Sequence, residues 1–441
     1  MKLGDIFLNK DFDDDLWDLK ADAIKVLKRN ALLHKDRNIN HGFNYKSLKF
    51  ANLKQYTLWN SCLNIISNSL LNPKRAREEF IYLLKNQQVN GFIRFYYYQH
   101  NEQSDIEKNS SNYSLTHPPL VATALRSIYD ATSKTDFIKS YAKYVNKYFD
   151  HLYESRISED NNFLLLDIKH PLENPITNSF NHKQNFKKGK IRQNLKNSES
   201  KKYLNGTLSL EGKIDKTNPN KVRDLFFNCI YIQGCYDLAY LCDQIGDNEQ
   251  STKFHQRARK MERFLIKNCW NRDDNLYYGL DDAGKIINDI KTSCSLIPII
   301  LDNIPNSHIH CLIDNYILNE QEFYTEYPIP ILSQNVSIKN DNKKLKNSKE
   351  LIRLDLNWLI IRGLQKHGFY NVAMELSQKT IDIVRKFGFW EYYHTHEGIG
   401  IGMSEYTPST IIVDIEDKIF GSDLDFIFNQ EWNRIKKLPD F

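Results

Sequence analysis

The sequence predicts an all-α fold, namely an (α/α)6 toroid of six helical hairpins with a few short strands in its loops. Apolar residues recur at helical spacing through most of the 441 residues. The expected helices come in pairs joined by short loops, which is typical of closed toroids and of open solenoids. Because no sequence repeat of fixed period is visible, we favour the toroid, in which loops at one end form a cleft.

The expected helices are marked by apolar faces and by residues that begin or end helices. Leu19, Ala23 and Val26 share one face of the first helix. Asn72-Pro73 ends the second helix, and Pro118-Pro119 opens the fourth. The helices expected after the first are residues 53–71, 75–85, 120–131, 136–153, 222–245, 252–268, 294–301, 307–318, 355–366 and 371–387, with a last one after Pro408. Residues 92–98 and 276–279 are the best candidates for strands.

Two polar stretches interrupt the helical pattern. Residues 181–220 are rich in Lys, Asn and Ser and offer little apolar surface to bury. We expect them to form a polar insertion or lid, with disorder as the alternative. Residues 334–350 are similar and shorter. The whole chain, residues 1–441, is expected to form one barrel domain, since large single domains exist.

Composition and charge exclude several classes of protein. The net charge of +5 is small for this length, and the basic residues 183–202 fit a solvated loop better than a nucleic-acid arm. No run of ~18 apolar residues predicts a membrane span. The N-terminus lacks the apolar core of a signal peptide, and the seven cysteines fit a reducing compartment, so we expect a cytoplasmic protein. Cys229, Cys235 and Cys242 lie along one expected helix, where buried packing is a better interpretation than metal binding.

Residues 389–415 hold the densest group of chemically useful side chains. Glu391 lies between Trp390 and Tyr392 at the end of a helix, just before a glycine-rich loop, where burial would raise its pKa. Inverting sugar hydrolysis needs such a carboxylate as base and a second carboxyl as acid, ~6.5–9.5 Å away. Glu391 could instead cap a loop. His394 and His396 have no third ligand nearby, so we expect hydrogen bonding rather than a metal, and no cofactor.

Polar and aromatic residues elsewhere are candidates for binding a substrate. Tyr56, Trp59 and Asn60 open the second expected helix, and aromatics with an amide on one turn suit sugar hydroxyls. Packing of Trp59 in the core is an equally good interpretation. Arg223 could hold an anionic substrate group. Its alternative is a salt bridge with Asp224 or another carboxylate.

Several motifs, in order along the chain, resemble glycoside hydrolase family 63, especially its short bacterial members that hydrolyse glucosylglycerate or mannosylglycerate. Those members are single-domain (α/α)6 barrels. The motifs are YTLWN (56–60), THPPLVATALRSIYDAT (116–132), KHPLENPITNSF (169–180), VRDLFFN (222–228), LNWLIIRGL (356–364) and FWEYYHTHEGIGIG (389–402). The last two are the more specific, and the others gain weight from their order.

The resemblance implies roles for particular residues. Glu391 matches the family's general base, whereas Thr177 stands where the family has its acidic Asp. Thr is no general acid near neutral pH. Glu173 is the candidate replacement, with Asp167 further back as the alternative, and either would need the loop to move. Tyr392 and Trp358 lie in matching motifs and are expected substrate contacts.

Three further departures from the family lie near the expected cleft. Asn60 replaces an Asp that contacts the sugar, and residues 351–359 lack the family's Gly-Pro-Val-Trp. Residues 406–409 read Tyr-Thr-Pro-Ser where the family has a Trp-containing segment. These losses fall where a substrate should bind, while the packing motifs persist.

Three hypotheses about function follow. The first is inverting hydrolysis of a small α-glycoside, such as glucosylglycerate or mannosylglycerate. The second, motivated by Thr177 and Asn60, is a catalytically silent barrel that binds a carbohydrate or a partner protein. The third is a six-hairpin isomerase or epimerase, for which the hints are His117, His170, His394 and His396. We expect a small carbohydrate as the partner, and neither nucleic acid nor membrane.

Overall fold

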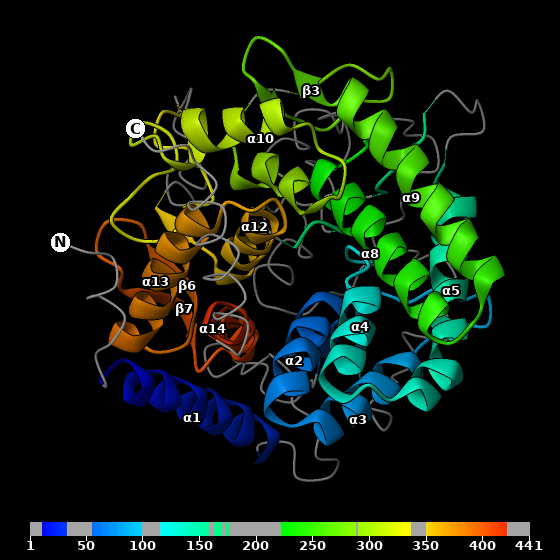
Figure 1. Ribbon diagram of the computed structural model, residues 1–441, viewed down its shortest axis with the longest axis horizontal. Helices are drawn as coiled ribbons and strands as arrows, with labels where there is room; N and C mark the ends of the chain where they lie inside the picture. Colours follow the sequence, from blue (N-terminus) through cyan, green and yellow to red (C-terminus); the bar gives the residue numbers. More distant parts are fainter. Residues whose placement is uncertain are drawn as a thin grey trace, which may run out of the picture.

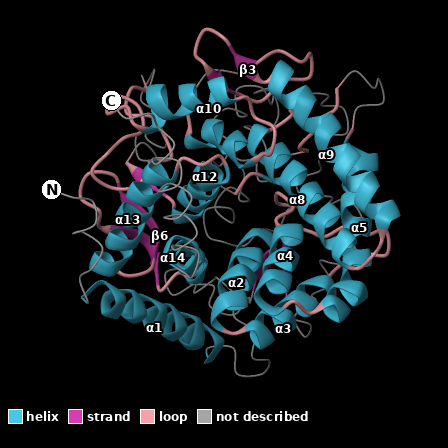
Figure 2. Cartoon of the chain, viewed as in Figure 1, coloured by secondary structure: helices cyan, strands magenta, loops and turns pink. Residues whose placement is uncertain are grey.

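The computed structural model describes residues 11–32, 55–98, 115–157, 163–169, 173–175, 222–287, 290–336 and 350–420. The insertion expected at residues 181–220 and the acid position Thr177 lie outside these ranges. Within them the chain consists of paired helices joined by short strands and loops (Figures 1 and 2). None of the described helices combines the length and the apolar composition that crossing a membrane requires.

Six segments form an inner ring. They are α2 (Leu58–Leu71), α4 (Val121–Thr132), α8 (Leu225–Gln244), η3 (Ser293–Ile300), α12 (Leu354–Lys366) and α14 (Ile412–Phe420). Each packs against the next, and α14 packs back against α2, so the ring closes (Figure 1). The (α/α)6 toroid predicted from the sequence is therefore confirmed.

A second set of helices surrounds this ring (Figure 2). They are α1 (Asp11–Leu32), α3 (Pro73–Leu84), α5 (Thr135–Arg156), α9 (Asn248–Asn268), α10 (Asn306–Leu312), extended by the π-helical turn η4 (Ile313–Ile317), and α13 (Tyr370–Phe387). Helices α3, α5, α9 and α13 each pack on the inner segment that precedes or follows them in sequence, and α1 packs on α14. Helices that follow one another in the sequence therefore pack against each other as hairpins, as the sequence predicted.

Burial explains which member of a hairpin lies inside. Nearly every residue of α8 is buried, including Cys229, Cys235 and Cys242, which confirms the packing interpretation of these cysteines. Its outer partner α9 buries only one apolar stripe and exposes charged residues. A helix that is apolar all round needs cover on every side, whereas an amphipathic helix can face solvent.

One inner segment differs in type from the expectation. The helix expected at residues 294–301 is the 3₁₀ helix η3, which contains Pro298. Proline lacks a backbone N–H and its ring clashes with the preceding turn of an α-helix, so an α-helix is disfavoured here. The segment still buries all eight of its residues and fills the sixth place of the inner ring.

Short strands lie in the connections. Strands β1 (Gln55–Thr57) and β2 (Tyr96–Tyr98) pair antiparallel, as do β3 (Trp270–Asn271) and β4 (Leu276–Tyr277). Strands β5 (Leu351–Ile352), β6 (Trp390–His394) and β7 (Gly400–Ser404) form a three-stranded sheet in that order. Residues 400–402 were expected in a glycine-rich loop, and this was wrong. Tyr392 and Tyr393 favour strands, and the turn before β7 contains Gly398 at a φ of +68°.

The inner segments run in the same direction, so the barrel has two distinct mouths. At the first, which we call the N-terminal mouth, the starts of α2, α8 and α12 meet: Trp59 contacts Phe226 and donates a hydrogen bond to Asp355. The sheet of β5, β6 and β7 lies at this mouth, because β5 leads directly into α12. At the opposite, C-terminal mouth lie Lys366 and Lys418, late in α12 and α14, together with Arg126 from the middle of α4.

Candidate active site

Glu391 lies on β6 opposite an irregularity in β7. Trp390 pairs with Ser404 and Tyr392 pairs with Ile401, so Gly402 and Met403 together face the single residue Glu391. Such a β-bulge twists the strands and redirects the side chain opposite it. The predicted base is therefore held by a rigid sheet rather than by a flexible loop.

Gly402 is required where it stands for two reasons. Its φ is +83°, a conformation that side chains with a Cβ rarely adopt. A Cβ at this position would also lie 2.8 Å from Oε2 of Glu391. The glycine thus leaves room for the Glu391 carboxylate beside the backbone of β7.

A chain of polar contacts connects Glu391 to the start of α12. Its carboxylate lies close enough to the backbone of Met403 and to the Tyr392 hydroxyl for both to lower its pKa. The Arg353 guanidinium in turn lies 5.6 Å from the centre of the Tyr392 ring. Arg353 pairs with Asp355 through Nε, at 2.9 Å, and through Nη2, at 2.5 Å. We call Glu391, Tyr392, Arg353 and Asp355 the base network.

Arg353 and Asp355 are each only 5% exposed, and other parts of the chain satisfy them. Asp355 Oδ2 accepts a hydrogen bond from Trp59 Nε1 at 2.8 Å, and Oδ1 accepts one from the backbone of Leu356. Arg353 Nη1 donates to the carbonyl oxygen of Pro175 at 3.1 Å. The base network therefore joins α2, α12, β6 and the segment 173–175.

Burial and charge set the protonation of this network. Burial raises the pKa of Glu391 above its usual value, while the charge of Arg353 and the nearby Met403 backbone and Tyr392 hydroxyl oppose the rise. Burial also disfavours the charge on Arg353, but Asp355 and Tyr392 outweigh it and hold its pKa well above the usual value. Arg353 is thus a permanent cation beside a carboxylate that is more basic than an ordinary Glu.

Asn60 and Tyr406 extend the site towards α14. The Tyr406 hydroxyl donates a hydrogen bond to Asn60 Oδ1 at 3.2 Å, and both side chains are buried. Burial raises the pKa of Tyr406; Arg353 opposes the rise, and Glu391 adds to it. Tyr406 is therefore near enough to Arg353 and Glu391 for their charges to affect its pKa. The sequence marked it only as part of a segment that departs from the family.

His117 is a second neighbour of the base network. It is buried, and burial together with the charge of Arg353 lowers the pKa of its imidazole to about 3. The ring is consequently neutral at any physiological pH. An uncharged imidazole leaves Arg353 as the cation that influences Glu391 most directly.

Two tryptophans expected to contact a substrate are core residues. Trp59 and Trp358 are both 0% exposed. Trp358 Nε1 donates to Asp414 Oδ2 at 2.6 Å, within the ring of inner helices, and its burial contradicts a contact with substrate. Trp59 donates a hydrogen bond to Asp355, so the influence of Trp59 on the site is indirect.

Arg223 is engaged by the chain itself. Its side chain is 1% exposed and lies 3.4 Å from Asp167, over the ring of Phe163. Its Nη1 donates a hydrogen bond to the carbonyl oxygen of Asp281 at 2.6 Å. The salt-bridge interpretation holds, with Asp167 rather than Asp224 as the partner, and no contact of Arg223 supports a role in holding a substrate anion.

Glu173 has a structural role that contradicts its candidacy as replacement acid. Its carboxylate is 0% exposed and forms two hydrogen bonds with Arg156, at 2.6 and 2.7 Å. The backbone N–H groups of Thr116 and Lys169 donate two more, at 2.9 and 2.7 Å. A general acid must reach the leaving oxygen with a free proton, and this carboxylate is enclosed by four donors.

The remaining candidates are described only in part. Tyr56 is placed by its backbone in β1, opposite Tyr97. Thr177 lies outside the described residues, two positions after Pro175. Among the parts of the chain that the structure describes, no group of three or more His, Cys, Asp or Glu could hold a metal ion. His394 instead lies 3.5 Å from Glu350.

Known glycoside hydrolases are similar to this chain in sequence. The model of the mannosylglycerate hydrolase MGH1-like glycoside hydrolase domain matches residues 54–337, more than half of the chain. Mannosylglycerate hydrolase from Rubrobacter radiotolerans is 20% identical over 400 residues, which cover 81% of this chain and 89% of that protein. Mannosylglycerate hydrolase from Thermus thermophilus is 22% identical over 334 residues, 68% of this chain and 76% of that protein.

Solved structures show the same fold. A GH63 mannosylglycerate hydrolase from Thermus thermophilus in complex with glucose superposes with a TM-score of 0.69 at 19% identity. The match covers 90% of this chain and 99% of the other. The neutral trehalase Nth1 from Saccharomyces cerevisiae is a more distant neighbour, with a TM-score of 0.56 at 10% identity over 86% of this chain and 74% of the other.

Proposed function

The chain belongs to the family of mannosylglycerate hydrolase MGH1-like glycoside hydrolase domains, and from this membership we propose that it hydrolyses a small α-glycoside, such as mannosylglycerate or glucosylglycerate, with inversion. The resemblance to glycoside hydrolase family 63 read from the motifs is thereby confirmed. The observation that carries the proposal is the setting of Glu391, a half-buried carboxylate of raised pKa that lies opposite a β-bulge and near the cation Arg353.

Glu391 is the proposed general base. It holds a water molecule, removes one of its protons, and directs the resulting nucleophile at the anomeric carbon from the face opposite the leaving group. Its raised pKa makes it a better proton acceptor than an ordinary Glu. Tyr392 and Arg353 are positioning residues, because they fix the carboxylate and keep a positive charge beside it.

The departing glycerate oxygen needs a proton, and position 177 offers no carboxyl to supply it. Glu173 is enclosed by donors, and Asp355 is held by Arg353 and Trp59. Protonation by solvent in place of an acid typically lowers the rate about 10²–10⁴-fold. We therefore propose a slow hydrolase, whose small-glycoside site retains its base.

The test is hexose release from mannosylglycerate and glucosylglycerate. We expect slow release by the native protein and its disappearance in Glu391→Gln. Glu397→Gln is the matched control, since Glu397 is an exposed carboxylate in the turn between β6 and β7. Proton NMR of the first sugar released gives the anomer, and a retained configuration would contradict the inverting mechanism.

The same experiment addresses the catalytically silent barrel. Release that is equal in the native protein and in Glu391→Gln would show that Glu391 is not the base. Absence of release from either glycoside by the folded protein would refute hydrolysis of these substrates. Calorimetric titration with each glycoside would then show whether the site binds a carbohydrate without cleaving it.

A further inference from the structure

A second cavity lies at the C-terminal mouth, at the opposite end of the barrel from Glu391. Its volume is about 550 Å³. Buried residues such as Leu120 and Ile230 line it, as do the exposed Asp243 and Asp302. The lining residues come mainly from α4, α8, α9, η3, α12 and α14.

Four basic side chains line this cavity. They are Arg126 on α4, Arg362 and Lys366 on α12, and Lys418 on α14. Arg126 pairs with Asp237 at 2.9 Å and Lys418 with Asp414 at 3.0 Å. Both carboxylates are buried behind the cavity wall, at 0% and 4% exposure. Arg126 also lies 3.6 Å from Asp130, and Lys366 pairs with Asp302 at 2.6 Å, so three of these four residues form ion pairs within the described part of the chain.

Arg362 differs from the other three basic residues of the cavity in its contacts. Among the described residues no carboxylate lies within ion-pairing distance of Arg362, and its guanidinium donates no hydrogen bond to any of them. The guanidinium lies 5.0 Å from the ring centre of Trp358. Lys418 is near enough for the two positive charges to disfavour each other, since burial and Arg362 together lower the pKa of Lys418. Arg362 attracts the carboxylates of Asp130 and Asp414 at longer range but forms no ion pair with either. A cation without an ion pair beside another cation is a natural place for an anion.

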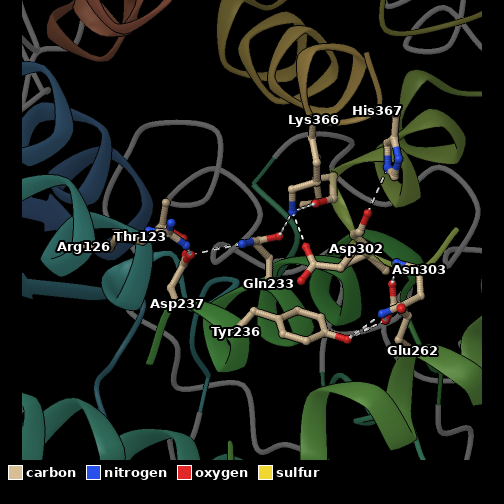
Figure 3. A network of polar contacts seen from close by, with 12 residues as sticks. Thr123, Arg126, Gln233, Tyr236, Asp237, Glu262, Asp302, Asn303, Lys366 and His367 are labelled. Atoms are coloured by element: carbon tan, nitrogen blue, oxygen red, sulfur yellow. Dashed lines mark hydrogen bonds and ion pairs between the residues drawn. The ribbon is translucent and has the colours of Figure 1, made fainter. Parts of the chain in front are cut away.

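A network of polar contacts fixes the walls in position (Figure 3). Asp237 accepts hydrogen bonds from Thr123, Arg126 and Gln233 at 2.6, 2.9 and 3.0 Å. Lys366 donates to Gln233 at 2.9 Å and to Asp302 at 2.6 Å. These contacts join α4, α8, α12 and the end of η3 around the cavity, so a ligand would meet preorganised groups rather than mobile ones.

The cavity is separate from the base network. Arg353 immediately precedes α12, and Arg362 lies nine residues later within it, which corresponds to roughly 14 Å along the helix axis. The buried residues Trp358 and Leu359 occupy the helix between them. A ligand in one site would therefore not touch the other.

We propose that this cavity binds a small oxyanion, carried by a carboxylate or phosphate group, with Arg362 and Lys418 as direct contacts. Arg126 and Lys366 add positive charge at its edge. The C-terminal ends of α4, α8 and α12 disfavour an anion, so one cation would not suffice. The four basic residues together provide the positive charge that an oxyanion needs, and Arg362 forms no ion pair with the described residues.

The test is calorimetric titration of the full chain with inorganic phosphate, and separately with acetate, at constant ionic strength. We expect one site for at least one of the two ions and at least tenfold weaker binding in Arg362→Met. Arg272→Met is the matched control, because Arg272 is exposed in the turn between β3 and β4 and should leave binding unchanged. Phosphate binding alone, or acetate binding alone, identifies the group that the site selects.

Two further variants keep the result interpretable. Lys418→Met should also weaken binding, whereas Glu391→Gln should not, since it lies at the other mouth. Each variant is checked by circular dichroism, and Arg362→Gln replaces Arg362→Met if the latter fails to fold. The proposal is overturned if neither ion binds, or if a folded Arg362 variant lacking the positive charge binds as tightly as the native protein. The basic residues would then serve only to complement the helix ends.

Discussion

Arg353 Nη1 donates a hydrogen bond to the carbonyl oxygen of Pro175, across 178 positions of the chain. The same guanidinium pairs with Asp355 and contacts Tyr392, which holds Glu391. One buried cation thus connects the candidate base to the segment that precedes Thr177.

Removing Arg353 alone should destabilise the protein. Arg353→Met leaves Asp355 as an uncompensated buried carboxylate, which typically costs about 3–5 kcal/mol. The double variant Arg353→Met/Asp355→Asn removes both charges and should recover much of that loss. Urea unfolding measures both. Equal stability of the single and double variants would show that the two charges are not coupled.

Replacing Gly402 should separate backbone strain from steric conflict at Glu391. Gly402→Ala adds a Cβ that would lie 2.8 Å from Glu391 Oε2, at a φ of +83°. Gly368→Ala is the matched control, because Gly368 has a φ of +81° and no atom within 4 Å of the added Cβ. Both should lose about 1–2 kcal/mol of stability from the left-handed backbone.

Hydrolysis should respond differently in the two glycine variants. Only Gly402→Ala displaces the Glu391 carboxylate, so only this variant should lose hexose release. The comparison uses initial rates at saturating glycoside, normalised to folded protein. A similar loss of activity in Gly368→Ala would mean that strain anywhere in the barrel is sufficient.

The sequence predicted those features that depend on local patterns. Apolar periodicity located α8 and α13, and a run of motifs led to the barrel and to the candidate base Glu391. The Arg353–Asp355 pair was missed as part of the site because its support is tertiary. Trp59, which donates to Asp355, is 296 positions away. The strand β7 was missed because its glycines resemble a loop until β6 pairs with it, and pairing is set by residues distant in the chain.

Burial decides which of the motif residues can reach a substrate. Trp358 and Glu173 belong to motifs shared with sugar-cleaving enzymes, and a motif does not reveal which side chains face solvent. Their indole and carboxylate turn inward, to Asp414 and Arg156 respectively. Sequence patterns therefore locate a motif more surely than they predict the direction of its side chains.

Restoring a carboxyl at position 177 should accelerate hydrolysis. Thr177→Asp returns the residue that the family uses as acid, and we expect a gain of at least tenfold, within the usual 10²–10⁴-fold effect of such an acid. Thr177→Asn is the control, since its amide has the same shape but no acidic proton. Rates are compared for both glycosides. An equal gain in both variants would point to size rather than proton transfer.

The stability of the barrel should fall as pH rises because of Glu416 on α14. This carboxylate is 2% exposed, and burial raises its pKa to about 7, while Lys20 at 3.6 Å opposes the rise. An unfolded Glu has a pKa of about 4.3, so between these values the folded state binds the extra proton. The contribution of Glu416 is therefore fully present below about pH 4.3 and is lost as pH rises through about 7.

Glu416→Gln should remove this dependence. The largest effect is about 3–4 kcal/mol, from the difference between the two pKa values, and should appear as a higher stability of the variant than of the native protein at pH 8. The adjacent Asp417 is exposed, so Asp417→Asn serves as the control. Urea unfolding at pH 5 and pH 8 measures the difference. If the native protein and Glu416→Gln change in parallel between these pH values, Glu416 is ionised at both pH values and the buried proton is absent.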